Sequence, residues 1–261
     1  MIKLFTVNYC MRVALSFLLM QLCCSCVFPK KSFHDVEIPA RIKGRYEQII
    51  CHSGYSVSYN ADWRISNWVA YELTPEEVAG TVSRKDKYIP DPKVNGATAT
   101  NDDYKGSGWD RGHMAPAADM KWSRRAMEES SYLSNICPQN HNLNGGVWKD
   151  IEEKTRSMVV KKGSMYVVCG PIVSKRSQTI GSNKVVVPDA FFKALLQKNN
   201  QRWEAIAFIC PNESGRKKLS SYAMTIDDLE KITGIDFFHS LPDEIENDVE
   251  SRFDLTYWKL K

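Results

Sequence analysis

Hydrophobic and polar residues follow two different periods along this chain. Alternation marks Tyr55–Tyr59, and an apolar run follows at Trp68–Leu73, which predicts two strands joined by a turn. Apolar residues recur at three- and four-residue spacing within 123–133 and 147–159, which predicts helices. Strands grouped around a few helices predict an α+β fold, with a mixed or antiparallel central sheet flanked by helices.

Further elements are expected in the second half of the chain. Segment 225–233 predicts a helix, because two acidic residues open its first turn and a glycine follows its end. Turn-forming residues dominate 90–108, which predicts a surface loop. Three β-branched or aromatic-rich runs predict central strands: Ser164–Gly170, Lys184–Val187 and Trp203–Cys210.

The first 26 residues have a composition of their own. They carry two basic residues, no acidic residue, and an apolar run from Val13 to Leu22 that is too short for a stable membrane span. This pattern predicts an export signal at 1–26. A basic, polar stretch follows and predicts a linker at 27–44; no long linker, low-complexity tract or repeat interrupts the rest, which predicts a single domain at 45–261. A buried N-terminal helix is the alternative for the first segment.

An export signal predicts an exported protein that is periplasmic, secreted or lipid-anchored at the cell surface. Cleavage between Ser25 and Cys26, followed by lipid attachment, is the alternative to free secretion. Outside the cytoplasm the thiols beyond the signal could form up to two disulfides, and buried free thiols fit the apolar surroundings equally well. These cysteines are Cys51, Cys137, Cys169 and Cys210.

Net charge gives little support for nucleic-acid binding. Two of the 35 basic residues lie in the first 26, so 33 basic residues stand against 31 acidic residues in the rest of the chain. Such a weak excess is not typical of a strongly basic nucleic-acid binder. Any case for a polyanionic substrate must therefore come from a local site.

The most informative polar constellation comprises two segments. DRGHMAPAAD occupies Asp110–Asp119, and LSNICPQNHNLNGGVWKDIEE occupies Leu133–Glu153. Together they resemble the DNA/RNA non-specific endonucleases, the family of secreted bacterial nucleases and mitochondrial endonuclease G. The resemblance extends over roughly 55–212. It implies a ββα-metal active-site motif and cleavage of phosphodiester bonds in both DNA and RNA.

The resemblance also implies how the metal and the attacking water are handled. It makes His113 the general base, Asn144 the single direct protein ligand of a hydrated Mg²⁺, and Glu152 a holder of that ion's waters; Mn²⁺ is the expected substitute. Imidazole suits the role of base because its unperturbed pKa is about 6.5. If a helix begins just after Asn144, Trp148 and Glu152 lie on nearly the same side as Asn144.

Three further roles follow from the resemblance. Arg111 is implied to contact phosphate, Asn135 to help organise the site, and Arg84 to stabilise the transition state. The sequence contains no zinc finger, helix-turn-helix or aromatic RNA-binding motif, so contacts are expected on phosphate and sugar. Lys121, Arg124 and Arg125 are additional candidates for such contacts.

Each residue also has a non-catalytic interpretation. A single histidine is often structural, Asn144 before a helix could be an N-cap, and Arg111 beside Asp110 could form a surface ion pair. Three rival functions remain at this level: a catalytically inactive nuclease-like binding protein, a phosphodiesterase for small nucleotides, and an adhesive lipoprotein. The sequence does not determine the oligomeric state.

Overall fold

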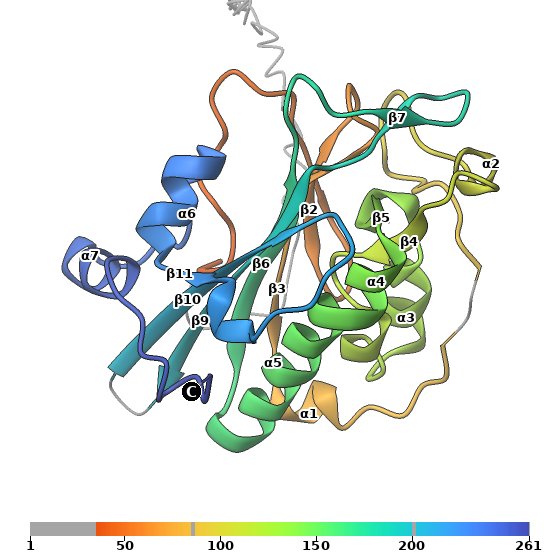
Figure 1. Cartoon of the computed structure of the whole chain (residues 1–261). Coiled ribbons are helices and arrows are strands. Elements are labelled where there is room, and N and C mark those ends of the chain that lie inside the picture. Colours follow the sequence, from red (N-terminus) through yellow and green to blue (C-terminus); the bar gives the residue numbers. More distant parts are fainter. Residues whose placement is uncertain (1–34, 85–86, 200–201, 261) are drawn as a thin grey trace, which may run out of the picture. The chain divides into compact units, whose positions relative to one another are not determined.

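The computed structural model describes residues 35–84, 87–199 and 202–260, so the expected export signal lies outside the described residues. A seven-stranded antiparallel sheet runs through the molecule in the order β1-β2-β3-β6-β9-β10-β11 (Figure 1). Its strands are β1 (Gln48–Cys51), β2 (Ser56–Asn60), β3 (Ile65–Leu73), β6 (Met165–Ile172), β9 (Ala190–Asn199), β10 (Arg202–Pro211) and β11 (Ala223–Met224).

Helices cover both faces of this sheet (Figure 1). One face carries α3 (Arg124–Ser130), α4 (His141–Leu143) and α5 (Lys149–Lys162). The other carries α6 (Ile226–Thr233) and α7 (Asp243–Glu250). The short helices α1 (Pro75–Val78) and α2 (Asn101–Tyr104) lie in connecting segments. Among the described residues no helix is long and apolar enough to cross a membrane.

Alternation along the strands builds two separate apolar cores. On β9, Phe191 and Leu195 belong to the core beneath α5, whereas Phe192 and Ala194 belong to the core beneath α6 and α7. Side chains two residues apart share a face of a strand. Lys193 therefore points to the same face as Phe191 and Leu195, toward α5.

A small ββα unit lies beside the main sheet. Strands β4 (Asp110–His113) and β5 (Ile136–Gln139) pair antiparallel, and the chain then runs through α4 into α5. Gly112 leaves room for the buried side chain of Gln139 on β5, because a Cβ atom at Gly112 would overlap that side chain. These elements confirm the expected α+β class with its ββα arrangement.

Two expectations about local structure were wrong. The run at 184–187 does not join the central sheet; it contributes β8 (Val185–Val186), which pairs only with β7 (Thr179–Ile180) in a separate hairpin. Each strand of this hairpin is only two residues long, and the Val186 amide donates to the Trp63 carbonyl, which precedes β3, rather than to a strand of the sheet. The expected loop at 90–108 also contains α2, which Asp103 stabilises by accepting from Thr100 N at 2.7 Å.

The four cysteines beyond residue 26 are all free thiols, so no disulfide links them. Cys137, Cys169 and Cys210 are buried, which is the alternative that the apolar runs suggested. Burial raises the pKa of the Cys137 thiol to about 12, so this thiol stays protonated at neutral pH.

Candidate active site

One tyrosine joins three of the expected site residues. Arg111 and His113 are two residues apart on β4 and point to the same face. The Tyr88 ring centroid lies 5.6 Å from that of His113, and the Arg111 Cζ lies 5.5 Å from the Tyr88 centroid. Arg84 Nη2 donates to the Tyr88 hydroxyl at 2.9 Å. Three residues far apart in sequence therefore converge on a side chain that the sequence analysis did not single out.

The guanidinium of Arg111 is held from a second direction by α2. Its Nε donates to Asn101 Oδ1 at 3.2 Å, and its Nη2 donates to the Asn101 carbonyl at 3.0 Å. Asn101 Nδ2 in turn donates to the Tyr88 carbonyl at 2.6 Å. The Tyr104 ring centroid lies 5.3 Å from Arg111 Cζ. These contacts orient the guanidinium, which is favourable for binding an anion whose position is fixed.

Asn144 lies beside the first residue of β4. Its Nδ2 donates to Asp110 Oδ2 at 2.9 Å, and His141 Nδ1 lies 3.0 Å from the same oxygen. With its amide nitrogen directed to Asp110, Asn144 has its amide oxygen to offer to another group. Amide and carboxylate oxygens are ligands that Mg²⁺ prefers, so this donor set fits the expected ion.

The N-cap interpretation of Asn144 does not hold. Asn140 is the residue that caps α4, because its Oδ1 accepts from Asn142 N and Leu143 N. Asn144 instead begins an irregular turn that is kinked at Gly146 and ends at Trp148.

A helix was expected to begin just after Asn144, but the chain is not continuously helical from this residue. Gly146 has φ −111° and ψ −117°, outside the helical region, and α5 starts only at Lys149. The angular relation expected between Asn144 and Glu152 therefore does not apply. No atom would lie within 4 Å of a Cβ added at Gly145 or Gly146, so the backbone there is open to close approach.

Glu152 occupies an unusual electrostatic position on α5. Burial raises the pKa of its carboxyl group to about 7, and the positive charge of Lys193 opposes this shift. Asp119 raises the same pKa, while Arg156 lowers it. Arg156 Nη1 pairs with Asp119 Oδ1 at 2.8 Å, and Tyr71 donates to Asp119 Oδ2 at 2.8 Å. The last residue of DRGHMAPAAD thus belongs to the charge network around Glu152.

Trp148 and Lys193 connect this network to β4. Trp148 Nε1 donates to the His113 carbonyl at 3.3 Å. The Lys193 ammonium lies 4.5 Å from the Trp148 ring centroid, and the Lys193 side chain is 1% exposed. Lys193 was not among the expected site residues, because the sequence pattern did not predict β9. The feature that could have identified this residue is a lysine with two apolar residues on each side.

The side chain of Asn135 hydrogen-bonds to main-chain atoms, not to the side chains of the other candidate residues. Its Oδ1 accepts from Ala115 N at 2.8 Å, and its Nδ2 donates to the carbonyl oxygens of Ala115 and Ser130 at 2.9 and 2.8 Å. The fully buried side chain therefore fixes the main chain just after His113.

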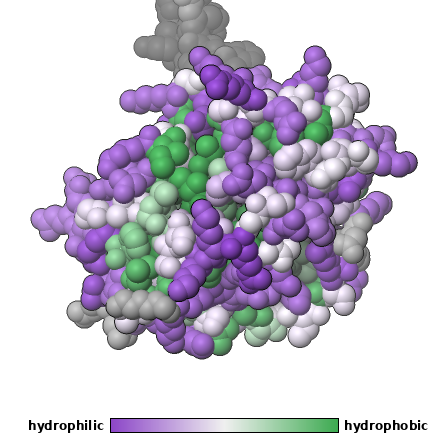
Figure 2. Space-filling view, viewed as in Figure 1, coloured by the Kyte–Doolittle hydropathy of each residue, from purple (hydrophilic) through white to green (hydrophobic). Residues whose placement is uncertain are grey.

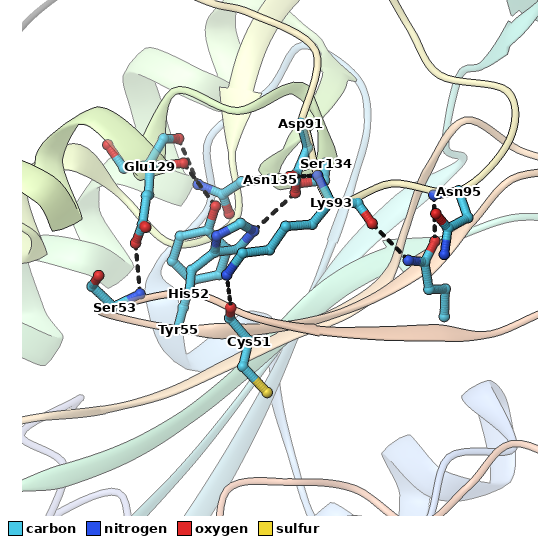
Figure 3. Close-up of polar contacts among 12 residues, drawn as sticks. Cys51, His52, Ser53, Tyr55, Asp91, Lys93, Asn95, Glu129, Ser134 and Asn135 are labelled. Carbon is cyan, nitrogen blue, oxygen red and sulfur yellow. Dashed lines mark hydrogen bonds and ion pairs between the residues drawn. The ribbon is translucent and has the colours of Figure 1, made fainter. Parts of the chain in front are cut away.

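A buried polar network anchors the segment that carries Tyr88 (Figure 3). His52 Nε2 lies 2.8 Å from Asp91 Oδ2, and Ser134 Oγ donates to the same oxygen at 2.5 Å. Burial alone would raise the pKa of Asp91, but the hydrogen bonds from His52 and Ser134 outweigh it and keep the pKa below its usual value. Leu133 N donates to the Ile89 carbonyl at 2.9 Å, which holds the residue after Tyr88 in place.

The additional basic candidates, Lys121, Arg124 and Arg125, are exposed. Arg125 Nε pairs with Glu129 Oε1 at 2.9 Å, so part of its charge is already compensated. Hydrophilic side chains dominate the face of the molecule shown in Figure 2, with smaller apolar patches between them.

Similarity to known proteins agrees with this architecture. A solved structure titled as the EndoG/EndoGI complex, on the mechanism of EndoG inhibition, superposes with a TM-score of 0.71 and 28% identity over 76% of this chain and 89% of that chain. The fold is therefore that of a ββα nuclease. The model of the DNA/RNA non-specific endonuclease family matches residues 39–244, and the chain belongs to this family.

The curated relatives include nucleases from animals and yeast. The mitochondrial nuclease EXOG of Mus musculus is 36% identical over 73% of this chain and 56% of its own length. Human mitochondrial endonuclease G is 33% identical over 76% of this chain and 69% of its own length. The mitochondrial nuclease of Saccharomyces cerevisiae is 32% identical over 77% and 66%. The chain thus spans little more than half the length of the EXOG nucleases.

These relatives contradict the exported location expected from the first 26 residues. Their names place them in mitochondria, which points away from a periplasmic, secreted or lipid-anchored protein. The physical reason for the error is that basic, acid-poor leaders are common to several destinations. The composition of residues 1–26 therefore does not by itself define a compartment.

Proposed function

We propose that this chain is a divalent-metal-dependent endonuclease that hydrolyses phosphodiester bonds of DNA and RNA without sequence preference. The observation that carries the proposal is the convergence of Arg84, Arg111 and His113 on Tyr88. Phosphodiester hydrolysis needs a base near neutral pH and positive charge on the phosphoryl oxygens. This group of side chains supplies both.

In the proposed mechanism, His113 takes the proton from the attacking water on its imidazole. Arg111, oriented by Asn101, binds a non-bridging oxygen of the phosphate. Arg84 adds positive charge as negative charge accumulates in the transition state. Asn135 acts indirectly, because it fixes the backbone that follows His113.

Asn144 is the residue proposed to hold the metal ion, through its side-chain oxygen, with Mg²⁺ as the natural ion and Mn²⁺ as a substitute. The chemistry that such an ion supplies when bound is neutralisation of charge on the leaving oxygen. Asp110 orients the Asn144 amide. Glu152, when ionised, accepts hydrogen bonds from waters at the site, and the positive charge of Lys193 favours this ionised form.

The proposed contacts address phosphate, which every nucleotide shares. Arginine contacts to phosphate carry no direct sequence information. We therefore propose that single-stranded DNA, double-stranded DNA and RNA are all substrates, and that activity falls as salt rises through counterion release.

The test is incubation of purified protein with circular plasmid and with RNA, in magnesium and in chelator. Random internal cuts in both substrates that require the metal support the proposal. Turnover of small nucleotides without plasmid nicking would identify a phosphodiesterase instead. Binding without cleavage would identify a catalytically inactive relative. Sequenced cut ends that share a strong consensus would contradict the lack of sequence preference.

A further inference from the structure

Three carboxylates gather where α6 meets α7, on the face of the sheet opposite α5 (Figure 1). Asp227 and Glu230 lie on α6, and Glu250 is the last residue of α7. One oxygen from each lies within 4.8 Å of the other two. The family comparison and the proposed nuclease site give this cluster no role.

Glu250 distinguishes this cluster from an exposed group of acids. It is only 5% exposed, and its Oε1 is fully enclosed without a hydrogen-bond partner among the described residues. A buried carboxylate oxygen without a partner is costly, and such atoms in native structures call for a ligand or an ion. The residue also lies at the C-terminal end of a helix whose last turn carries no basic side chain, where the helix dipole favours a cation.

The surrounding charges increase this demand for a cation. Burial raises the pKa of Glu250 to about 9, and the negative charges of Glu230, Glu246, Asp227 and Asp236 act in the same direction. Burial likewise raises the pKa of Glu230 to about 7, although Phe237 N donates to its Oε1 at 2.7 Å.

Basic residues near this cluster pair with other acids. Lys231 Nζ lies 2.8 Å from Asp228 Oδ1. Arg252 Nη2 lies 2.6 Å from Asp248 Oδ2, and its Nη1 lies 3.2 Å from Glu204 Oε2. His239 lowers the pKa of Glu246, which is not one of the three clustered carboxylates. The charge of the three clustered carboxylates is thus not balanced by these side chains.

We propose that Asp227, Glu230 and Glu250 form a Ca²⁺ site that fastens α7 to α6. The three oxygens lie no more than 4.8 Å from one another, so a single ion can reach all three. Calcium is the ion that suits them, because Ca²⁺ accepts carboxylate oxygens in flexible geometry, whereas Mg²⁺ demands a near-ideal octahedron. Water completes the coordination on the exposed side. The site is structural, because the central sheet separates it from β4 and α5.

The experiment uses the full chain with Asn144→Ala, which removes the proposed metal ligand of the nuclease site. Calcium at about a hundredfold excess over its Kd should raise Tm by at least ~5 °C at pH 7.5. Equilibrium dialysis against labelled calcium should give one bound ion per chain. The same concentration of magnesium should raise Tm much less.

Glu250→Gln, added to Asn144→Ala, should abolish both the bound calcium and the rise in Tm. It should also raise Tm in chelator, because a buried glutamine does not have to take up a proton on folding as Glu250 does. Glu244→Gln is the matched control, since Glu244 is exposed on the same helix, and it should retain the calcium response.

The competing explanation is a proton shared between Glu230 and Glu250. In that case Tm in chelator would rise as pH falls, calcium would have no effect at any pH from 6 to 8, and dialysis would detect no bound ion. That result would overturn the proposed site. A calcium response that survives Glu250→Gln would overturn it as well.

Discussion

Trp148 donates its indole hydrogen to the main-chain oxygen of His113 at 3.3 Å. This contact joins the end of β4 to the turn that leads into α5, so it connects His113 to the segment that begins at Asn144. Lys193, which lies over the Trp148 ring, extends the connection to the central sheet.

His113→Ala should lower the cleavage rate by at least ~10², because a positioned base contributes about this much. Initial rates on plasmid DNA measure the effect, and an unchanged Tm shows that the fold is intact. His239→Ala is the control, since His239 is exposed and lies in the segment between α6 and α7. Near-normal activity of a folded His113→Ala protein would exclude the proposed base.

Asn144→Ala should reduce cleavage at every practical magnesium concentration. A neutral amide oxygen binds Mg²⁺ weakly, so the wild-type protein should lose its activity readily in chelator and recover it when magnesium returns. Asn142→Ala is the matched control on the exposed surface of α4. Tightly bound zinc in the purified protein would contradict an oxygen-ligated magnesium site.

Tyr88→Phe removes the hydroxyl that accepts from Arg84 and keeps the ring beside His113. We expect a loss of rate of about fivefold to tenfold, which is equivalent to about 1–1.4 kcal/mol and is the usual contribution of one hydrogen bond. In a double-mutant cycle, Tyr88→Phe should have little further effect once Arg84 is alanine. Additive losses would show that the hydroxyl acts independently of Arg84.

Glu152→Gln should change the dependence of stability on pH. In the native state the pKa of Glu152 is raised from 4.5 to about 7, so folding favours the protonated form. The stability associated with that form is present below about pH 4.5 and is lost as pH rises through 7. In chelator, Glu152→Gln should therefore be more stable than wild type at pH 8, by about 1–3 kcal/mol, and nearly equal to it at pH 4. Equal stabilities at both pH values would contradict the raised pKa.

Asp91→Ala should destabilise the protein by about 3 kcal/mol or more, because it leaves His52 and Ser134 buried without their shared acceptor. Urea unfolding measures this loss. The exposed Asp102→Ala on α2 is the control and should change stability by less than about 0.5 kcal/mol. A small loss for Asp91→Ala would show that the network in Figure 3 does not anchor the Tyr88 segment.

Local patterns in the sequence were sufficient for part of the fold and for the family. The alternation at 55–59 became β2, and the helical periodicity at 147–159 became α5. DRGH identified the strand that carries Arg111 and His113. These features depend on residues that are close in the sequence, so the spacing of apolar and polar residues is enough to predict them.

The tertiary structure decided what those residues contact. β9 reads AFFKALLQKN, which is rich in good helix formers, and only pairing with β6 and β10 on both sides makes it a strand. The same pairing buries Lys193 beside Trp148. Tyr88 meets Arg84, Arg111 and His113 in a segment that also holds Asp91, which is bound to His52 and Ser134. Contacts between segments this far apart leave no periodic trace in the sequence, since they arise from packing rather than from local conformation.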